Sequence, residues 1–184
     1  MHLVIPAAEH LESYVNALRR GWSPDNHDAD AGRAELRQIE ADPSAFLAGQ
    51  VDTGGNGPTI TLPDGSSVPR LPGYHRWMWD GEFCGTIGIR WQPGTEALPP
   101  YCLGHIGFAV VPWKRGLGYA TEALRTLLPG ARQLGLRYVE LTCNATNNAS
   151  RHVITANGGV LVGEFDRGAA RGGGTGLRFR IELG

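Results

Sequence analysis

Apolar and polar positions alternate most regularly in the middle of the chain, where two strand patterns flank a helical one. Ile106–Val111 is an almost wholly apolar run ended by Pro112, which is typical of a buried strand. Between Leu117 and Leu134 apolar residues recur at helical spacing, which predicts an amphipathic helix. Arg137–Cys143 alternates and predicts another strand. The chain therefore runs from a strand through a glycine-rich turn into a helix, and then into a further strand.

The flanking sequence predicts further strands and helices on the same grounds. Apolar or alternating runs predict strands at Leu3–Ile5, His75–Trp79, Phe83–Trp91, Val160–Phe165 and Gly176–Leu183. Asp80-Gly81 separates the second of these strands from the third, which is a strong hairpin signal. Helices are predicted at Ala7–Arg20 and Asp28–Ala41, and Asp42-Pro43 ends the second helix.

The remaining segments are predicted to be loops: Thr53–Gly73, Pro93–Gly104 and Arg167–Gly174. The first loop holds a short alternating patch, Thr59–Leu62, followed by a Pro63-Asp64-Gly65 turn. No loop has the character of a domain linker, so we expect residues 1–184 to form a single domain.

Composition argues against several classes of protein. Hydrophobic residues make up 41% of the chain, but no apolar run approaches membrane-spanning length, and the first residues lack the features of a signal peptide. Cys84, Cys102 and Cys143 form neither a disulfide framework nor a zinc pattern, and the histidines show no metal-ligand spacing. A net charge of −1 argues against nucleic acid as the main partner. We therefore expect a cytoplasmic protein with no metal site and no membrane or nucleic-acid partner.

The glycine-rich turn Arg115–Ala120 is the main candidate site. Backbone N–H groups at the start of a helix have no partner within the helix, and the helix dipole adds partial positive charge there. Such a turn suits a phosphate or pyrophosphate, and Gly116 and Gly118 let the ligand approach the backbone closely. The turn has neither the Gly-Lys-Ser/Thr end of a P-loop nor the third glycine of the dinucleotide fingerprint. An ordinary strand-to-helix connection is the alternative.

The order of residues in this turn resembles the acyl-CoA pyrophosphate loop of the GNAT N-acetyltransferase superfamily, which reads Arg/Gln-x-x-Gly-x-Gly/Ala. Its three fixed positions are occupied by Arg115, Gly118 and Ala120. The resemblance implies that acetyl-CoA is the co-substrate and that its pyrophosphate lies on the turn. The residues in contact with it would be Arg115, Gly116, Leu117, Gly118, Tyr119 and Ala120.

A second motif follows the strand at Arg137–Cys143. Asn147–Ser150 resembles the Asn-x-x-Ser/Ala signature of the same superfamily, followed by a short helix and the helix stop Asn157-Gly158. In this resemblance Asn147 bonds the pantetheine arm of CoA and Ser150 lies near the thiol. Capping of the short helix is the alternative for both residues. The motif is most like that of the branch that acetylates the N-termini of ribosomal proteins.

The resemblance covers residues 74–165 best, and it implies both a fold and a reaction. The fold is α/β (α+β), a mixed, mostly antiparallel twisted sheet with helices on both faces. Acetyl-CoA would lie where two strands splay apart, with its pantetheine arm along the backbone of Phe108, Ala109 and Val110. Gly107 would either allow a bulge that opens this gap or lie in a plain core strand. An amine acceptor would attack the thioester directly in a ternary complex.

An amine must lose a proton before it attacks, so a general base is useful. His105, just before the cofactor strand, is the candidate base, and a hydrogen-bonded histidine at a strand edge is the alternative. Ile154 stands where many members of the superfamily carry a tyrosine that protonates the leaving thiolate. The general acid is therefore open between Ser150 and Tyr119.

Three functions remain open at this point. The first is an acetyl-CoA-dependent N-acetyltransferase, the second a non-catalytic acyl-CoA-binding or sensing domain, and the third an unrelated nucleotide-binding α/β domain. The two motifs together disfavour the third, and only an assay of turnover separates the first two. The acceptor, a small molecule or a peptide N-terminus, is not identified because its pocket would be built from the variable loops. A homodimer is compatible with the sequence.

Overall fold

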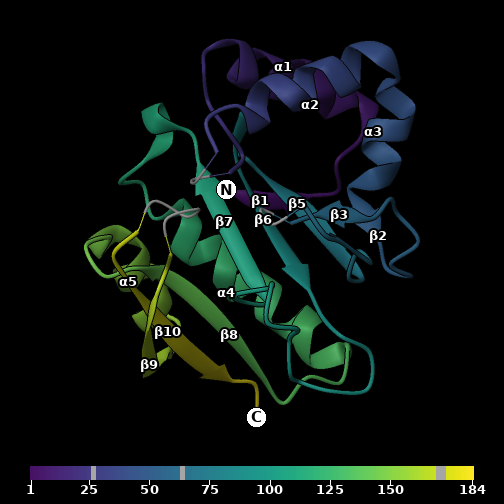
Figure 1. The fold of residues 1–184 in the computed structure, drawn as a ribbon. Coiled ribbons are helices and arrows are strands. Elements are labelled where there is room, and N and C mark those ends of the chain that lie inside the picture. Colours follow the sequence, from purple (N-terminus) through teal and green to yellow (C-terminus); the bar gives the residue numbers. More distant parts are fainter. Residues whose placement is uncertain (26–27, 63–64, 169–172) are drawn as a thin grey trace.

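The computed structural model describes residues 1–25, 28–62, 65–168 and 173–184, and it contains two antiparallel sheets side by side (Figure 1). The strands of the first sheet are β1 His2–Val4, β2 Val51–Asp52, β5 Gly73–Trp79, β6 Phe83–Arg90 and β7 Ile106–Val110. Their order is β1-β5-β6-β7, and β2 also pairs with β5. The strands of the second sheet are β8 Tyr138–Asn144, β9 Val160–Asp166 and β10 Thr175–Glu182, in the order β8-β10-β9. A separate small hairpin consists of β3 Ile60–Thr61 and β4 Ser67–Val68.

The helices cover both faces of the first sheet. They are α1 Ala8–Arg19, α2 Ala31–Ala41, α3 Pro43–Gly49, α4 Tyr119–Gln133 and α5 Asn148–Thr155, with a short 3-10 helix at Pro112–Lys114. Figure 1 shows α1, α2 and α3 grouped over one side of the first sheet. The fold class predicted from the sequence, a mostly antiparallel sheet with helices on both faces, is confirmed.

The core under α1–α3 is rich in aromatic side chains. Tyr14 stacks on Trp77 of β5 with ring centroids 4.4 Å apart, and Phe83 of β6 meets Tyr14 edge-on. The hydroxyl of this buried tyrosine donates a hydrogen bond to Glu35 of α2, as buried tyrosines generally require. These contacts hold the N-terminal helices on the sheet.

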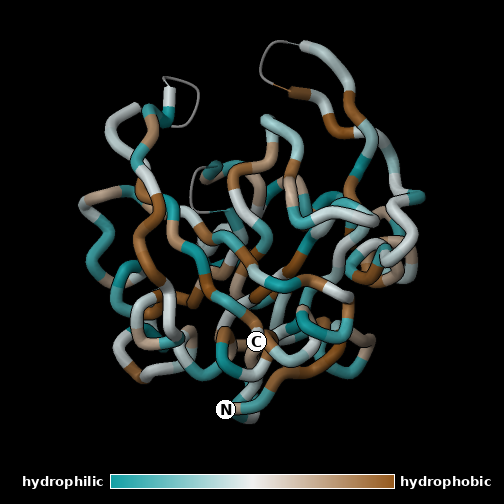
Figure 2. The backbone as a smooth tube through the Cα atoms, turned by 90° about the horizontal axis from the view of Figure 1, so that it is seen from below, coloured by the Kyte–Doolittle hydropathy of each residue, from teal (hydrophilic) through white to brown (hydrophobic). Residues whose placement is uncertain are grey.

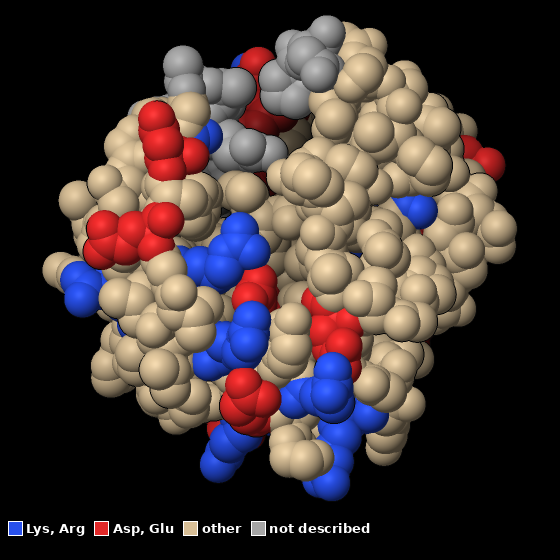
Figure 3. All heavy atoms as spheres, turned by 60° about the horizontal axis from the view of Figure 1, so that its bottom comes forward, with Lys and Arg blue, Asp and Glu red and all other residues tan. Residues whose placement is uncertain are grey.

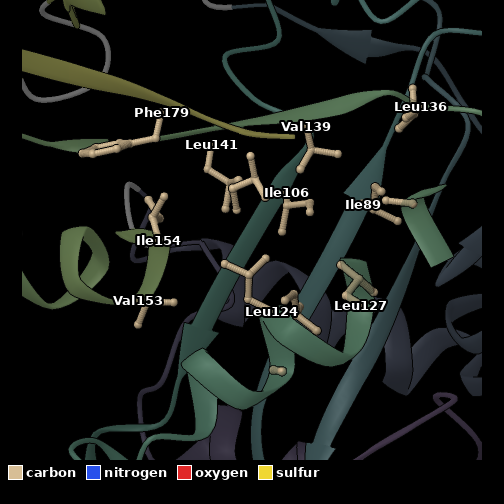
Figure 4. Close-up of a cluster of buried hydrophobic side chains, with 14 of the residues drawn as sticks. Ile89, Ile106, Leu124, Leu127, Leu136, Val139, Leu141, Val153, Ile154 and Phe179 are labelled. Atoms are coloured by element: carbon tan, nitrogen blue, oxygen red, sulfur yellow. The ribbon is translucent and has the colours of Figure 1, made fainter. Parts of the chain in front are cut away.

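The second core lies between α4, α5 and both sheets. Figure 4 shows Leu124 and Leu127 of α4 pointing toward the strands, with Ile106 of β7 and Leu141 of β8 opposite them. A fully buried side chain of this size stabilises the fold by roughly 1.5–3 kcal/mol. Because α4 is anchored in this way, the loop that precedes it is held against the end of β7.

The predicted strands and helices agree with the structure to within a few residues, with two informative differences. The helix predicted at Asp28–Ala41 begins at Ala31. Asp42-Pro43 does end that helix, but it also starts α3, which the sequence did not predict. The Asp42 side chain accepts a hydrogen bond from the Ala45 N–H at 2.9 Å, and Pro43 is the first helical residue.

The predicted loops are only partly described. Pro63 and Asp64 of the predicted Pro63-Asp64-Gly65 turn, and residues 169–172 of the third loop, lie outside the described residues.

Among the described residues, no helix is long and apolar enough to cross a membrane. Figure 2 shows hydrophobic and hydrophilic segments interleaved along the chain. In the same part of the chain, no group of three or more histidine, cysteine or acidic residues is arranged to hold a metal ion.

Candidate functional site

The glycine-rich turn lies where the sequence placed it, between β7 and α4. Gly116 and Gly118 have φ angles of +78° and +77°, which L side chains rarely adopt, and a Cβ atom on either would meet nothing within 4 Å. The Glu122 N–H donates to the Gly118 carbonyl at 3.1 Å, so the N–H groups of the residues between them have no earlier partner in the helix. Partial positive charge and open space therefore coincide at the start of α4.

A hydrogen-bonded cluster attaches this turn to the hairpin between β5 and β6. Lys114 donates to Asp80 at 2.9 Å and pairs with Glu82 at 2.8 Å, and the Tyr119 hydroxyl donates to Asp80 at 2.6 Å. The hydrogen bonds from Tyr119 and Lys114 hold the pKa of Asp80 well below its usual range. The bond to Asp80 also raises the pKa of Tyr119. Tyr119 therefore supports the loop, and its proton is already engaged, which weakens the case for it as the general acid.

The backbone of β7 presents alternate residues to the neighbouring sheet. The Val111 N–H donates to Cys84 at 3.0 Å and the Arg90 N–H donates to His105 at 2.9 Å, so odd-numbered residues of this segment bond to β6. By this alternation the polar groups of Phe108 and Val110 are directed toward β8. Those of Ala109 are directed at β6, so it does not fit the predicted role of holding the pantetheine arm.

The exposed side chain of Arg115 contacts the end of β7, because its Nε donates to the Val110 carbonyl at 3.2 Å.

The separation of the two sheets does not arise from a bulge at Gly107. The register between β6 and β7 is continuous from Gly85–Val110 to Ile89–Ile106. Gly107 is thus a plain strand residue, the second of the two readings left open above.

His105, directly before β7, joins the first sheet to β8 of the second sheet by hydrogen bonds. The backbone N–H of His105 donates to the Glu140 carbonyl of β8 at 2.7 Å, and the ring Nδ1 of His105 accepts a hydrogen bond from the Glu140 backbone N–H at 2.9 Å. The side chain is 1% exposed, and burial lowers the pKa of the imidazole even though the charge of Glu140 opposes the shift. Because Nδ1 already accepts a bond, the neutral ring carries its proton on Nε2 and has no free lone pair. This geometry argues against the predicted role as base and for the alternative of a hydrogen-bonded strand residue.

Asn147 and Ser150 lie at the start of α5, beside the end of β8. The Asn147 Oδ1 accepts from the Ser150 N–H at 3.0 Å, so Asn147 is the N-cap of this helix. Its amide NH2 has no hydrogen-bond partner within the described part of the chain, so a role as ligand stays a prediction. Ile154, at the position of the expected tyrosine, is 1% exposed and packs into the core. Its aliphatic side chain has no proton to donate to the thiolate.

A concavity of about 550 Å³ lies away from the turn, at the end of β9 and β10. It is lined by Glu164, Phe165, Asp166, Gly174 and Thr175. We place the candidate site at the turn, because the N-terminus of α4, with its unpartnered backbone donors, lies there beside the end of β7.

Comparisons with known proteins identify the family of the chain. Residues 66–160, more than half of the chain, match the family model described as an acetyltransferase (GNAT) domain, and this match spans both motifs. No curated protein matches the sequence.

Solved structures of similar fold include the microcin C7 self-immunity acetyltransferase MccE in complex with acetyl-CoA and AMP, with 11% identity and a TM-score of 0.62 over 98% of this chain and 91% of that one. RimL, a ribosomal L7/L12 α-N-protein acetyltransferase in complex with coenzyme A, gives 14% identity and a TM-score of 0.62 over 98% and 92%. YncA from Salmonella typhimurium, with acetyl-CoA, gives 15% identity and a TM-score of 0.55 over 100% and 94%. These similarities establish the fold, and the family match establishes the relationship: the chain belongs to the GNAT acetyltransferase family.

Proposed function

We propose that this protein transfers the acetyl group of acetyl-CoA to an amine acceptor by direct attack in a ternary complex. The observation that carries the proposal is the open N-terminus of α4, framed by Gly116 and Gly118, next to a strand whose backbone is directed toward the gap between the sheets. MccE, RimL and YncA, which share this fold, have acetyl-CoA or CoA in their structures.

The proposed position of the cofactor follows from the described geometry. The pyrophosphate would accept hydrogen bonds from the backbone of Gly116–Ala120, with the exposed Arg115 beside it. The pantetheine arm would run along Phe108 and Val110 toward Ser150. A backbone N–H positioned on the thioester oxygen would stabilise developing negative charge by roughly 3 kcal/mol.

The reaction needs few protein groups. The neutral amine nitrogen bonds to the thioester carbon, the C–S bond breaks, and the proton that the nitrogen loses as the amide forms passes through water to the leaving thiolate. A lysine-like amine has a pKa of about 10.4, so its deprotonation at pH 7 costs roughly 4.6 kcal/mol. With His105 engaged between the sheets, we propose that the amine loses its proton to water and that the rate rises with pH as the amine deprotonates.

On the sequence grounds given above, we further propose a cytoplasmic enzyme that needs no metal and acts on a small molecule or a peptide N-terminus. A homodimer is compatible with this reading. The same grounds give no reason to invoke a nucleic-acid or membrane partner.

A thiol-release screen tests the function. Acetyl-CoA is offered with small amines and with peptides that carry a free N-terminus, and mass spectrometry confirms the acetylated product. The proposal predicts CoA release that depends on the acceptor and is unaffected by EDTA. Tight acetyl-CoA binding without turnover on any amine would instead identify a binding domain and contradict the proposal.

A further inference from the structure

Several arginines of this fold are paired with carboxylates. Arg178 and Arg180 share Glu140, and Arg137 pairs with Glu96. Figure 3 shows the same arrangement on one face of the molecule, where basic and acidic side chains lie next to one another. Pairing of this kind neutralises the guanidinium charge locally, most effectively where the pair is partly buried, as at Glu140.

Arg70, Arg76 and Arg90 depart from this arrangement. Over the residues that the structure describes, none of the three has a carboxylate oxygen within 4.0 Å. All three act electrostatically on one residue, His75 of β5, and together with burial, which is the largest effect, they lower its pKa to about 4. Arg76 follows His75 on β5 and lies over the Tyr74 ring, so it belongs to the opposite face of the sheet, and Arg70 and Arg90 are the two guanidinium groups considered with the neutral imidazole below.

The sheet provides space for two of these side chains. His75, Gly88 and Gly107 are cross-strand partners on β5, β6 and β7 and lie on one face. A Cβ atom at Gly88 would come within 2.3 Å of the His75 ring, and one at Gly107 within 3.3 Å of an Arg90 guanidinium nitrogen. The two glycines thus form a floor over which His75 and Arg90 lie.

Polar atoms in this group are left without partners. His75 Nδ1 and Arg70 Nε are both buried and have no hydrogen-bond partner among the described residues. The neighbouring carboxylate, Asp52, acts on Arg70 only at longer range and is itself bonded to backbone N–H groups, including that of Gly57 at 2.7 Å. Buried donors beside unneutralised guanidinium groups are what an anion would satisfy.

The group lies beside the strand proposed to carry the thioester. Gly107, next to the Arg90 guanidinium, directly precedes Phe108, and the Arg90 N–H bonds to the carbonyl of His105. Resting on the proposed acetyl transfer, we propose that Arg90, with Arg70 and His75, binds the carboxylate or phosphate of an anionic acceptor and so directs its amine to the gap between β7 and β8. The enzyme would then select amines that carry a negative group over neutral amines of the same size.

Matched acceptors test the inference. The series of ω-amino acids from glycine to 6-aminohexanoate is compared with the corresponding amides, and phosphoethanolamine with ethanolamine. We expect kcat/KM for the best anionic acceptor to exceed that of its neutral partner by about tenfold or more, as a charge-assisted hydrogen bond allows. The phosphate and carboxylate pairs show which anion is preferred.

Arg90→Gln should reduce this preference to a factor below about three, Arg90→Lys should retain part of it, and the acetyl-CoA Kd should stay unchanged in both. Arg132→Gln, an exposed arginine of α4, is the matched control and should keep the preference. Equal rates for anionic and neutral acceptors, or a preference that survives in Arg90→Gln, would overturn the inference.

A binding measurement separates this inference from the proposed function. In NMR spectra the His75 ring signal, assigned by its loss in His75→Asn, should shift on addition of the preferred anionic amine, or of inorganic phosphate, and should titrate at a higher pH. The neutral partner should leave it unchanged, and Arg90→Gln should abolish the shift. An anion-dependent shift without CoA release contradicts acetyl transfer but supports the anion site, whereas turnover with no anion effect contradicts the site alone.

Discussion

Replacement of His105 by alanine should destabilise the fold without removing a catalytic group. The side chain is 1% exposed and accepts the Glu140 N–H at 2.9 Å, so the substitution leaves a buried donor of β8 without a partner. An orphaned buried donor costs about 1–3 kcal/mol. The cavity left by the ring, roughly 40–80 Å³, adds about 1–2 kcal/mol. We therefore expect the free energy of unfolding to fall by about 2–5 kcal/mol, measured by urea denaturation with an unchanged m-value.

The pH dependence of this loss provides a second readout. Burial lowers the pKa of His105 in the folded protein, so the folded state favours the neutral ring. The resulting stability is fully present above the unfolded pKa of about 6.5 and decreases as the pH falls toward the folded pKa. His105→Ala should remove this component. His105→Asn, whose Oδ1 can accept the Glu140 N–H, should recover part of the stability.

The same variants decide between the structural and the catalytic role. If His105 only joins the sheets, the folded fraction of His105→Ala should keep the dependence of rate on pH seen in the wild type. A variant that is as stable as wild type but about a hundredfold slower, with the rise in rate between pH 6 and 8 lost, would show that His105 is the base and would refute our reading.

Two further predictions concern the loop and the second motif. Asn147→Ala should lower stability by about 1 kcal/mol, since it removes the cap on the Ser150 N–H, and should also weaken acetyl-CoA binding. Asn147→Asp keeps an oxygen that can cap the helix, so its stability in thermal unfolding should match that of the wild type. An alanine variant with unchanged acetyl-CoA affinity would show that capping is the whole role of Asn147. Asp80→Asn should weaken acetyl-CoA binding by loosening Lys114 and Tyr119, measured by calorimetry. Since the pKa of Asp80 is lowered in the fold, the stability that its carboxylate contributes is present above its ordinary pKa and is lost as the pH falls through the folded value. If the stability of Asp80→Asn fell at low pH in the same way as that of the wild type, this assignment would be wrong.

Local sequence patterns predicted the elements that depend on local chemistry. The hairpin at Asp80-Gly81 and the turn at Gly116–Gly118 rest on backbone conformations that few residues adopt, so their residues indicate them directly. The helix α3 was missed because Asp42-Pro43 is read equally well as a helix end or a helix start. Only the structure shows that it is both.

Features that depend on pairing between distant strands could not be predicted in this way. The neighbours of His105 follow from the contact between β7 and β8, which brings in Glu140 from beyond the whole of α4. The arginine group around His75 likewise forms only when β5 pairs with β6 in a particular register. One signal was present in the sequence: Gly88 and Gly107 interrupt two apolar strands, which indicates space for a neighbouring side chain.

Acetyl-CoA affinity measured by isothermal titration calorimetry on two aspartate variants tests the central claim most directly. Gly118→Asp places a side chain and a negative charge at the start of α4, whereas Gly21→Asp, at a φ of +84° with nothing within 4 Å, imposes the same backbone strain away from the loop. Each should lose about 1–2 kcal/mol of stability. We predict that Gly21→Asp binds acetyl-CoA like the wild type and that Gly118→Asp binds at least about a hundredfold more weakly, a difference of roughly 2.7 kcal/mol. Equal affinity in the two variants would contradict the placement of the cofactor on this loop.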